Sequence, residues 1–170
     1  MYKTGHSLIK AKMREIDSPL GGEMSGHIFF KERWFGFDDG TYAGARLLEI
    51  LSQASHASDV LNALEGSFST PELNVAIKEG ESTKLIQGLI DVVQQKGLPM
   101  PEHNPQLMTI DGLRIDWDHG FGLIRASNTT PVLVLRFEGH TNAALESIEK
   151  EMLSLLRQVM PHASLTEASH

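Results

Sequence analysis

Residues 121–137 read FGLIRASNTTPVLVLRF, and this stretch decides how the second half of the chain folds. Residues 121–124 and 132–137 are apolar runs, each typical of a strand. Between them the seven residues 125–131 (RASNTTP) are polar, which predicts a rigid loop at the end of a sheet. This loop offers a guanidinium, hydroxyls, an amide and backbone N–H groups, a set of donors that suits phosphate. The alternative is an ordinary Ser/Asn/Thr-rich turn with a surface arginine.

The neighbouring segments supply further strands. Residues 73–77 alternate apolar and polar side chains, as in a half-buried strand. Asp111-Gly112 lies between the strand-like runs 107–110 and 113–117, and this dipeptide in that setting predicts a hairpin. With the two strands around residues 125–131, we expect a sheet of four main strands.

Two helices accompany these strands. We expect Ser82 to cap a helix that ends at Gly97, and Thr141 to cap a second helix that ends at Pro161. The order β-α-β-β-β-α closes as a four-stranded, largely antiparallel sheet with two helices on one face, an α+β fold. The tail, residues 161–170, is expected to be disordered.

The first part of the chain is different. Residues 7–16 predict a short basic helix, the aromatic run 34–37 (WFGF) is predicted to be core, and Asp38-Asp39-Gly40 is predicted to cap a helix. These elements have too few strands for a sheet of their own. We therefore expect a truncated α/β piece at 1–65, a linker at 66–71 (GSFSTP), a complete domain at 72–160 and the tail.

The amino-acid composition argues against several classes of function. Lysine and arginine total 15 against 22 for aspartate and glutamate, a formal net charge of −7. An acidic chain without a basic run is a poor candidate for nucleic-acid binding, and no apolar run is long enough for a membrane span. The chain has no cysteine and no apolar leader at its first residues. We expect a soluble, cytoplasmic protein.

Glu23, Ser25 and His27 form a second polar group. If residues 23–27 are extended, these three side chains point to one side of the chain and can hydrogen-bond a polyol as donors and acceptors. The alternative is a solvated glycine-rich loop. A zinc site of His6, Glu23 and His27 lacks any standard ligand spacing, so we predict no metal ligands.

Three motifs, taken together, carry a resemblance. The stretches 3–7 (KTGHS), 22–27 (GEMSGH) and 125–131 (RASNTTP), supported by 29–34 (FFKERW) and 37–40 (FDDG), resemble the α-D-phosphohexomutases. The match is best with the bacterial phosphomannomutase/phosphoglucomutase branch, and it covers nearly all of this chain. Three motifs in the right order, with similar sequence between them, make the resemblance specific.

The resemblance implies an enzyme of four domains around a cleft. Its first domain carries a phosphoserine in a Thr/Ser-Ala-Ser-His-Asn-Pro loop, and its second carries a magnesium-binding Asp-Gly-Asp-Gly-Asp-Arg loop. Neither motif occurs here: Ala54-Ser55-His56 lacks the Asn-Pro. The chain therefore resembles the end of the third domain joined to the complete, TBP-like fourth domain. We expect no catalytic nucleophile in it.

The resemblance also implies a role for each loop. In such enzymes a phosphoserine and a bound 1,6-bisphosphate interconvert hexose 1- and 6-phosphates, with Mg²⁺ as cofactor and glucose 1,6-bisphosphate as intermediate and activator; mannose and glucose are the expected sugars. The implied sugar contacts are His6, Glu23, Ser25 and His27, and the implied phosphate contacts are Arg125, Ser127, Asn128, Thr129 and Thr130. The alternative is a non-catalytic sugar-phosphate binding or interaction module, in which the open edge of the truncated sheet recruits a partner or a second copy.

Overall fold

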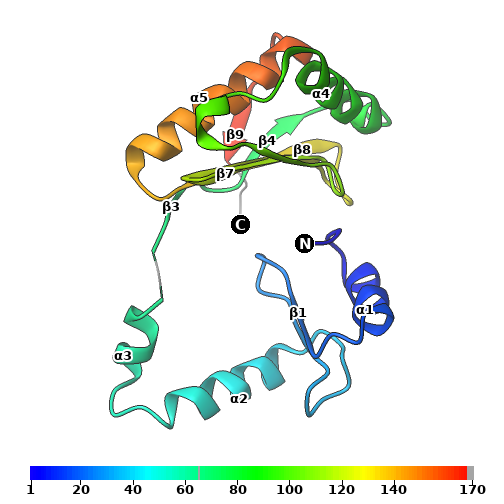
Figure 1. Ribbon diagram of the computed structural model, residues 1–170. Helices are drawn as coiled ribbons and strands as arrows, with labels where there is room; N and C mark the ends of the chain where they lie inside the picture. Colours follow the sequence, from blue (N-terminus) through cyan, green and yellow to red (C-terminus); the bar gives the residue numbers. More distant parts are fainter. Residues whose placement is uncertain (65, 168–170) are drawn as a thin grey trace. The chain divides into compact units, whose positions relative to one another are not determined.

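The computed structural model describes residues 1–64 and 66–167. The chain divides into two compact units, Met1–Glu65 and Gly66–His170. Each unit has its own secondary structure and its own packing, and each is described separately below (Figure 1).

The second unit is built on one sheet in which all strand pairings are antiparallel among the described residues. The strand order is β5-β6-β7-β8-β4-β9, and β3 pairs with the far end of β8. The strands are β3 (Phe68–Ser69), β4 (Leu73–Ala76), β5 (Gln106–Met108), β6 (Leu113–Trp117), β7 (Gly120–Ala126), β8 (Val132–Gly139) and β9 (Leu165–Glu167). The four main strands predicted from the sequence are β4, β6, β7 and β8, and β5 is the first strand of the predicted Asp111-Gly112 hairpin. The short strands β3 and β9 were not predicted.

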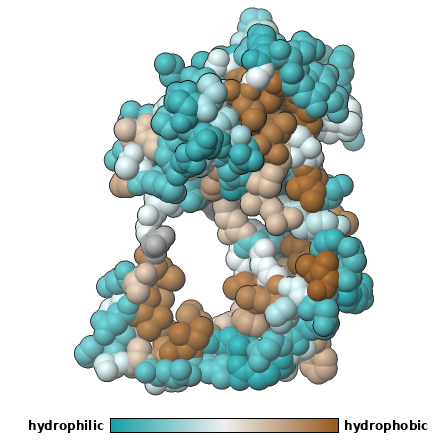
Figure 2. All heavy atoms as spheres, in the orientation of Figure 1, coloured by the Kyte–Doolittle hydropathy of each residue, from teal (hydrophilic) through white to brown (hydrophobic). Residues whose placement is uncertain are grey.

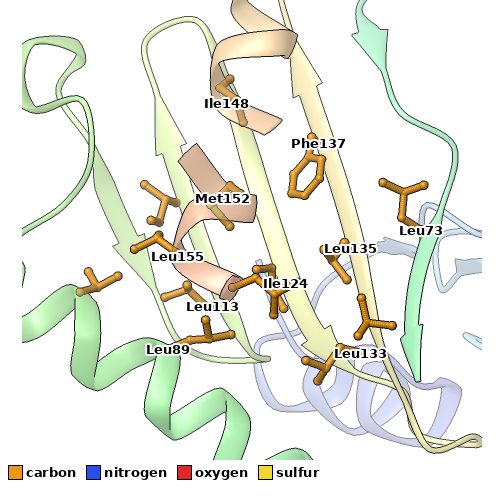
Figure 3. Packing of buried hydrophobic residues seen from close by; sticks show 14 of the residues in the cluster. Leu73, Leu89, Leu113, Ile124, Leu133, Leu135, Phe137, Ile148, Met152 and Leu155 are labelled. Atoms are coloured by element: carbon orange, nitrogen blue, oxygen red, sulfur yellow. The ribbon is translucent and has the colours of Figure 1, made fainter. Parts of the chain in front are cut away.

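Two long helices, α4 (Ser82–Lys96) and α5 (Asn142–Val159), cover one face of this sheet, and a short 3-10 turn, η1 (Pro101–His103), precedes β5 (Figure 1). Figure 3 shows the core between the layers, where side chains from α5 and α4 meet those of β6, β7 and β8. Leu113, Ile124 and Phe137 are fully buried from the sheet side. Burial of these side chains is the main favourable contribution to folding. The predicted α+β fold with an antiparallel sheet is confirmed.

Two glycines of the sheet, Gly122 and Gly139, lie in close contact with helix α5. A Cβ atom at Gly122 would lie 2.4 Å from Cγ of Met152, and a Cβ atom at Gly139 would lie 2.4 Å from the backbone nitrogen of Leu145. At Gly139 the neighbour is the backbone of α5, so a larger residue there would displace the start of the helix, whereas at Gly122 the Met152 side chain would have to move. Gly139 therefore allows the start of α5 to lie close against β8.

Two expectations for this unit are wrong. The segment 66–71, expected as a linker, contains β3, and Thr70 is tied to β8 by hydrogen bonds from its backbone N–H to the Phe137 carbonyl (3.0 Å) and from the Phe137 N–H to its hydroxyl (3.2 Å). The tail, expected as disordered, contains β9, which pairs with β4. Without β9, strand β4 would be an open edge, and pairing satisfies its free backbone groups. Residues 168–170 of that tail lie outside the described residues.

The helix caps follow the sequence closely. Thr141 accepts a hydrogen bond from the Ala144 N–H (3.1 Å) and caps α5, as predicted. Gly97 ends α4 with a φ of 86°, a conformation that glycine adopts without strain. Ser82 is the first residue of α4 rather than its cap, since Glu81 takes that position.

The first unit contains α1 (His6–Glu15), β1 (Leu20–Gly22), β2 (Ile28–Phe30), α2 (Gly40–Leu51) and α3 (Ala57–Asn62). Strands β1 and β2 form an antiparallel hairpin that packs on α1, with Met13 and Phe29 buried. Asp39 caps α2 by accepting a hydrogen bond from the Tyr42 N–H (2.9 Å), which confirms the predicted cap. The same carboxylate accepts a hydrogen bond from the Trp34 indole (3.1 Å).

The aromatic run 34–37 is not core, contrary to the prediction. Trp34 stacks on Tyr42 with ring centroids 4.3 Å apart, whereas Phe35 and Phe37 are 78% and 41% exposed. The chain reverses direction here, because Arg33 and Gly36 both have positive φ and the Gly36 N–H donates to the Phe30 carbonyl (2.8 Å). A tight turn of this kind leaves the two phenylalanines outside.

Helix α2 has an apolar face that the described part of the first unit leaves uncovered. Leu47, Leu48 and Ile50 are exposed, as are Leu61 and Leu64 at α3 and just after it. Figure 2 shows hydrophobic side chains gathered over α3 and the adjoining end of α2. The described part of the first unit has few elements against which to bury this face.

Candidate functional site

The loop between β7 and β8 is a tight hairpin, as predicted. The strands pair down to Ala126 opposite Leu133, and the Ser127 N–H then donates to the Val132 carbonyl (3.0 Å). The Val132 N–H donates in turn to the Thr130 carbonyl (2.8 Å). These bonds fix the backbone of residues 127–131 at the end of the sheet.

The Ser127 hydroxyl lies at the centre of this loop. It contacts the hydroxyls of Thr130 (3.0 Å) and Thr129 (3.4 Å), and its oxygen accepts long hydrogen bonds of 3.3 Å from the backbone N–H groups of both threonines. This is the local pattern by which serine organises a turn. The side chains of Asn128, Thr129 and Thr130 are exposed, so their polar groups can reach a ligand.

The loop forms one wall of a cavity of about 320 Å³. The other wall is the segment between β4 and α4, and the Ile77 N–H joins the two walls by donating to the Pro131 carbonyl (3.0 Å). The lining residues from this second wall are Ile77, Lys78, Glu79, Gly80 and Ser82. Sequence reasoning missed this wall, because only the pairing of β4 with β8 brings residues about fifty positions apart to the same end of the sheet.

Arg125 is not among the residues that line the cavity. It occupies β7 opposite Val134, and it is half-buried. One guanidinium nitrogen, Nη1, donates to the Ala126 carbonyl (3.2 Å). Of the five predicted phosphate contacts, the structure thus brings four to one cavity and leaves Arg125 beside the base of the loop.

The predicted sugar loop is a turn, not an extended segment. The Glu23 N–H donates to the His27 carbonyl (2.9 Å), the Gly26 N–H donates to the Glu23 carbonyl (3.0 Å), and Gly26 has a φ of 89°. The alternation argument for residues 23–27 is therefore wrong, since the chain reverses between β1 and β2. A glycine-rich sequence between two short strands favours a hairpin turn over extension.

The turn nevertheless gathers polar groups. Ser25 donates to one oxygen of Glu23 (3.4 Å), and the other oxygen accepts a bond from the Gly5 N–H (3.3 Å), next to His6. His6 begins α1, and its Nδ1 contacts only the neighbouring Ser7 hydroxyl (3.4 Å) within the described contacts. The carboxylate thus draws the start of α1 and the turn together.

His27 is oriented by a residue that the sequence did not single out for this purpose. Its Nδ1 lies 2.7 Å from a carboxylate oxygen of Asp38, just ahead of the residue that caps α2. A carboxylate on Nδ1 fixes the ring and leaves Nε2 for a ligand. No group of three or more histidine, aspartate or glutamate side chains in the described part of the chain is arranged to hold a metal ion.

Comparisons with known proteins identify the family to which the chain belongs. Residues 1–68 match the family described as phosphoglucomutase/phosphomannomutase, alpha/beta/alpha domain III, and residues 72–155 match its C-terminal domain. The chain belongs to the phosphoglucomutase/phosphomannomutase family. The resemblance drawn from the three sequence motifs is thereby confirmed.

Individual relatives are similar over almost the whole chain. A phosphoglucomutase of Neisseria meningitidis is 55% identical over 156 residues, which are 92% of this chain and 33% of that protein. A phosphomannomutase/phosphoglucomutase of Pseudomonas aeruginosa is 52% identical over 160 residues, 94% of this chain and 33% of that protein. A crystal structure of a family protein from Burkholderia thailandensis superimposes with a TM-score of 0.83 at 50% identity, covering 97% of this chain and 33% of that one.

The chain therefore spans about a third of the length of these relatives, and the part it spans corresponds to the third and C-terminal domains. Across the described residues, no helix is both long and apolar enough to cross a membrane.

A separate cluster of histidines lies at the opposite end of the sheet, with His119 in the turn between β6 and β7, His103 at the end of η1 and His140 just after β8. The rings of His103 and His119 meet edge to face, with centroids 4.3 Å apart. Nδ1 of His119 is buried without a hydrogen-bond partner among the described groups. Burial lowers the pKa of His119 below 6.5, the nearby charges of His103 and His140 lower this pKa further, and Asp118 and Glu102 oppose the shift.

This lowered pKa predicts an acid-sensitive C-terminal unit. The unfolded chain binds a proton at His119 near pH 6.5, whereas the folded chain binds it only at lower pH. Stability is therefore intact above pH 6.5, falls as the pH drops from 6.5 to the lowered pKa, and levels off below it. His119→Phe should reduce this loss. The urea midpoint of the unit, followed by NMR signals of β7 and β8 from pH 8 to pH 5, measures the effect. The exposed His162→Phe is the matched control, and an equal reduction in both variants would contradict the assignment.

Proposed function

We propose that this chain supplies the sugar-recognition and phosphate-binding loops of a phosphohexomutase, which interconverts hexose 1-phosphate and hexose 6-phosphate through a 1,6-bisphosphate. One observation carries the proposal. The rigid Ser127-centred loop presents hydroxyls, an amide and backbone N–H groups at a cavity, in a chain that belongs to the phosphoglucomutase/phosphomannomutase family.

The phosphate role rests on the donors at this loop. Ser127, Thr129 and Thr130 carry hydroxyls that can turn their protons from one another to a phosphate oxygen, and Asn128 adds an amide. The N–H groups that Ser127 holds at 3.3 Å are weakly engaged and can donate to an anion. Arg125 donates one hydrogen bond to the Ala126 carbonyl, and the other N–H groups of its guanidinium suit two phosphate oxygens.

The sugar role rests on the turn in the first unit. A hexose phosphate that reacts at both ends must bind in two orientations, so its hydroxyls meet the same protein groups in different places. Glu23, Ser25, His27 and His6 suit this requirement, because together they donate and accept hydrogen bonds. The Asp38 contact keeps the imidazole of His27 in a fixed orientation.

The phosphoryl donor of the proposed reaction has no counterpart in these 170 residues. The sequence contains neither the Ser-His-Asn-Pro loop nor the Asp-Gly-Asp-Gly-Asp loop. The residues present do not fit a magnesium site in the described part of the chain. The role of this chain is therefore to hold and orient the sugar phosphate, a large part of catalysing phosphoryl transfer.

Replacing Arg125 by alanine tests the phosphate role. Loss of the charged donors should weaken binding of glucose 1-phosphate by about 1.5–3 kcal/mol, roughly tenfold to a hundredfold in Kd. Chemical-shift titration of the purified chain measures Kd. Arg157→Ala, on the exposed side of α5, is the control and should bind like wild type. Equal affinity of Arg125→Ala and wild type would remove Arg125 from the site.

Replacing Glu23 by glutamine tests the sugar role. The amide keeps the shape but loses the charged acceptor, which should change the difference in binding free energy between mannose 1-phosphate and glucose 1-phosphate by about 0.5–1.5 kcal/mol. Affinity for inorganic phosphate should stay constant. Glu15→Gln on α1 controls for the change of net charge. A variant that loses phosphate affinity but keeps its sugar preference would place the sugar site elsewhere.

The second candidate is a non-catalytic binding or interaction module, which the exposed apolar face of α2 favours. Binding, turnover and sedimentation, measured on one sample of the purified chain, distinguish the two candidate functions. With glucose 1-phosphate, glucose 1,6-bisphosphate and magnesium, we expect the purified chain to bind sugar phosphate without turnover, and to sediment as a monomer. Turnover by this chain alone would contradict the assignment of its loops as binding elements only. A stable dimer that binds no sugar phosphate would favour the interaction module.

A further inference from the structure

Lys78 lines the phosphate-loop cavity from the wall that sequence reasoning missed. It lies two residues after the end of β4, it is exposed, and its ammonium forms no ion pair with any described residue. The lysine therefore carries a positive charge that is not neutralised within the unit, at the edge of a polar cavity.

The charges around this cavity are few. The loop side of the lining consists of Ser127, Asn128, Thr129, Thr130 and Pro131, which are all uncharged. Arg125 is not part of the lining. The charged lining residues are Lys78 and Glu79, and they have opposite signs. Hydroxyls and amides can orient a phosphate, but a dianion at a neutral surface gains little without a cation nearby.

The backbone of Lys78 is fixed relative to the loop. Strands β4 and β8 pair to Ala76 opposite Val132, and the Ile77 N–H then donates to the Pro131 carbonyl (3.0 Å). On the other side the Glu81 N–H donates to the Lys78 carbonyl (3.1 Å), and Gly80, with a φ of 81°, turns the chain into α4. The lysine side chain is flexible, but the backbone from which it extends is fixed at the edge of the cavity.

We propose that Lys78 is a further phosphate-binding residue of this site: its ammonium pairs with the dianionic phosphate of a phosphomonoester in the cavity, while Glu79 lowers the affinity for the same group. The proposal rests on the proposed function and adds to it a binding wall and a charge. The Ser82 hydroxyl, at the first residue of α4, lines the same wall and supplies a further donor.

Two substitutions with opposite expected effects test it. Lys78→Met keeps the aliphatic stem, and it should raise the Kd for glucose 1-phosphate and for inorganic phosphate about tenfold. Glu79→Gln removes the repulsion and should lower both values about twofold to threefold. Chemical-shift titration of the full chain gives the Kd values, and the unbound spectra check that each variant folds.

The control is Lys84→Met on α4, which is outside the lining of this cavity and should bind like wild type. Lys84→Met removes one positive charge, as Lys78→Met does. If long-range attraction between the chain and phosphate were the only cause, both variants would weaken binding equally. Salt gives a second readout: the affinity of wild type should fall more steeply with ionic strength than that of Lys78→Met.

The outcomes separate the two proposals. If Arg125→Ala weakens binding while Lys78→Met matches wild type or Lys84→Met, this inference is wrong and the proposed function stands. If wild type binds neither glucose 1-phosphate nor inorganic phosphate, both are overturned. Weaker binding by Lys78→Met, tighter binding by Glu79→Gln and an unchanged Lys84→Met support the second wall.

Discussion

Strand β8 is the element on which the C-terminal unit depends, because it pairs with three other strands. Strand β7 lies along one edge, and β4 and β3 divide the other edge between them. Its inward side chains, among them Leu133, Leu135 and Phe137, are fully buried under the helices. Because β7 and β4 both end beside the start of β8, the two walls of the cavity follow from the same set of backbone hydrogen bonds. The candidate site is therefore a consequence of strand pairing.

Much of the fold could be predicted from local patterns. The Asp111-Gly112 hairpin, the Thr141 and Asp39 caps and the glycine at the end of α4 each depend on chemistry within a few residues. Strands β3 and β9 could not be predicted in this way. They are two and three residues long, and they exist only because β8 and β4 offer free edges to distant parts of the chain. The exposed phenylalanines of the run 34–37 show the same limit, since hydrophobicity alone does not say where a turn will point.

Part of the candidate site could likewise be predicted from the sequence, and part could not. Ser127, Thr129 and Thr130 were predictable because one hairpin loop holds them all, whatever surrounds it. The second wall was not, since Lys78 approaches the loop through pairing between strands far apart in sequence. In the other unit, Glu23 and Ser25 do meet, but through a turn rather than by alternation along a strand. The chemistry of the residues was predictable, and the geometry that unites them was not.

The C-terminal strand β9 has a consequence for how this unit assembles and opens. Its contact with β4 joins Thr166 to Asn74, 92 positions apart, across the entire unit. Closing so long a loop adds an entropic cost, although this cost grows only slowly with loop length. With only three residues, β9 also has little to hold it once a fluctuation begins. The outer edge of β4 is thus covered by a strand of only three residues, and loss of that strand would expose a sheet edge of the kind at which chains begin to associate.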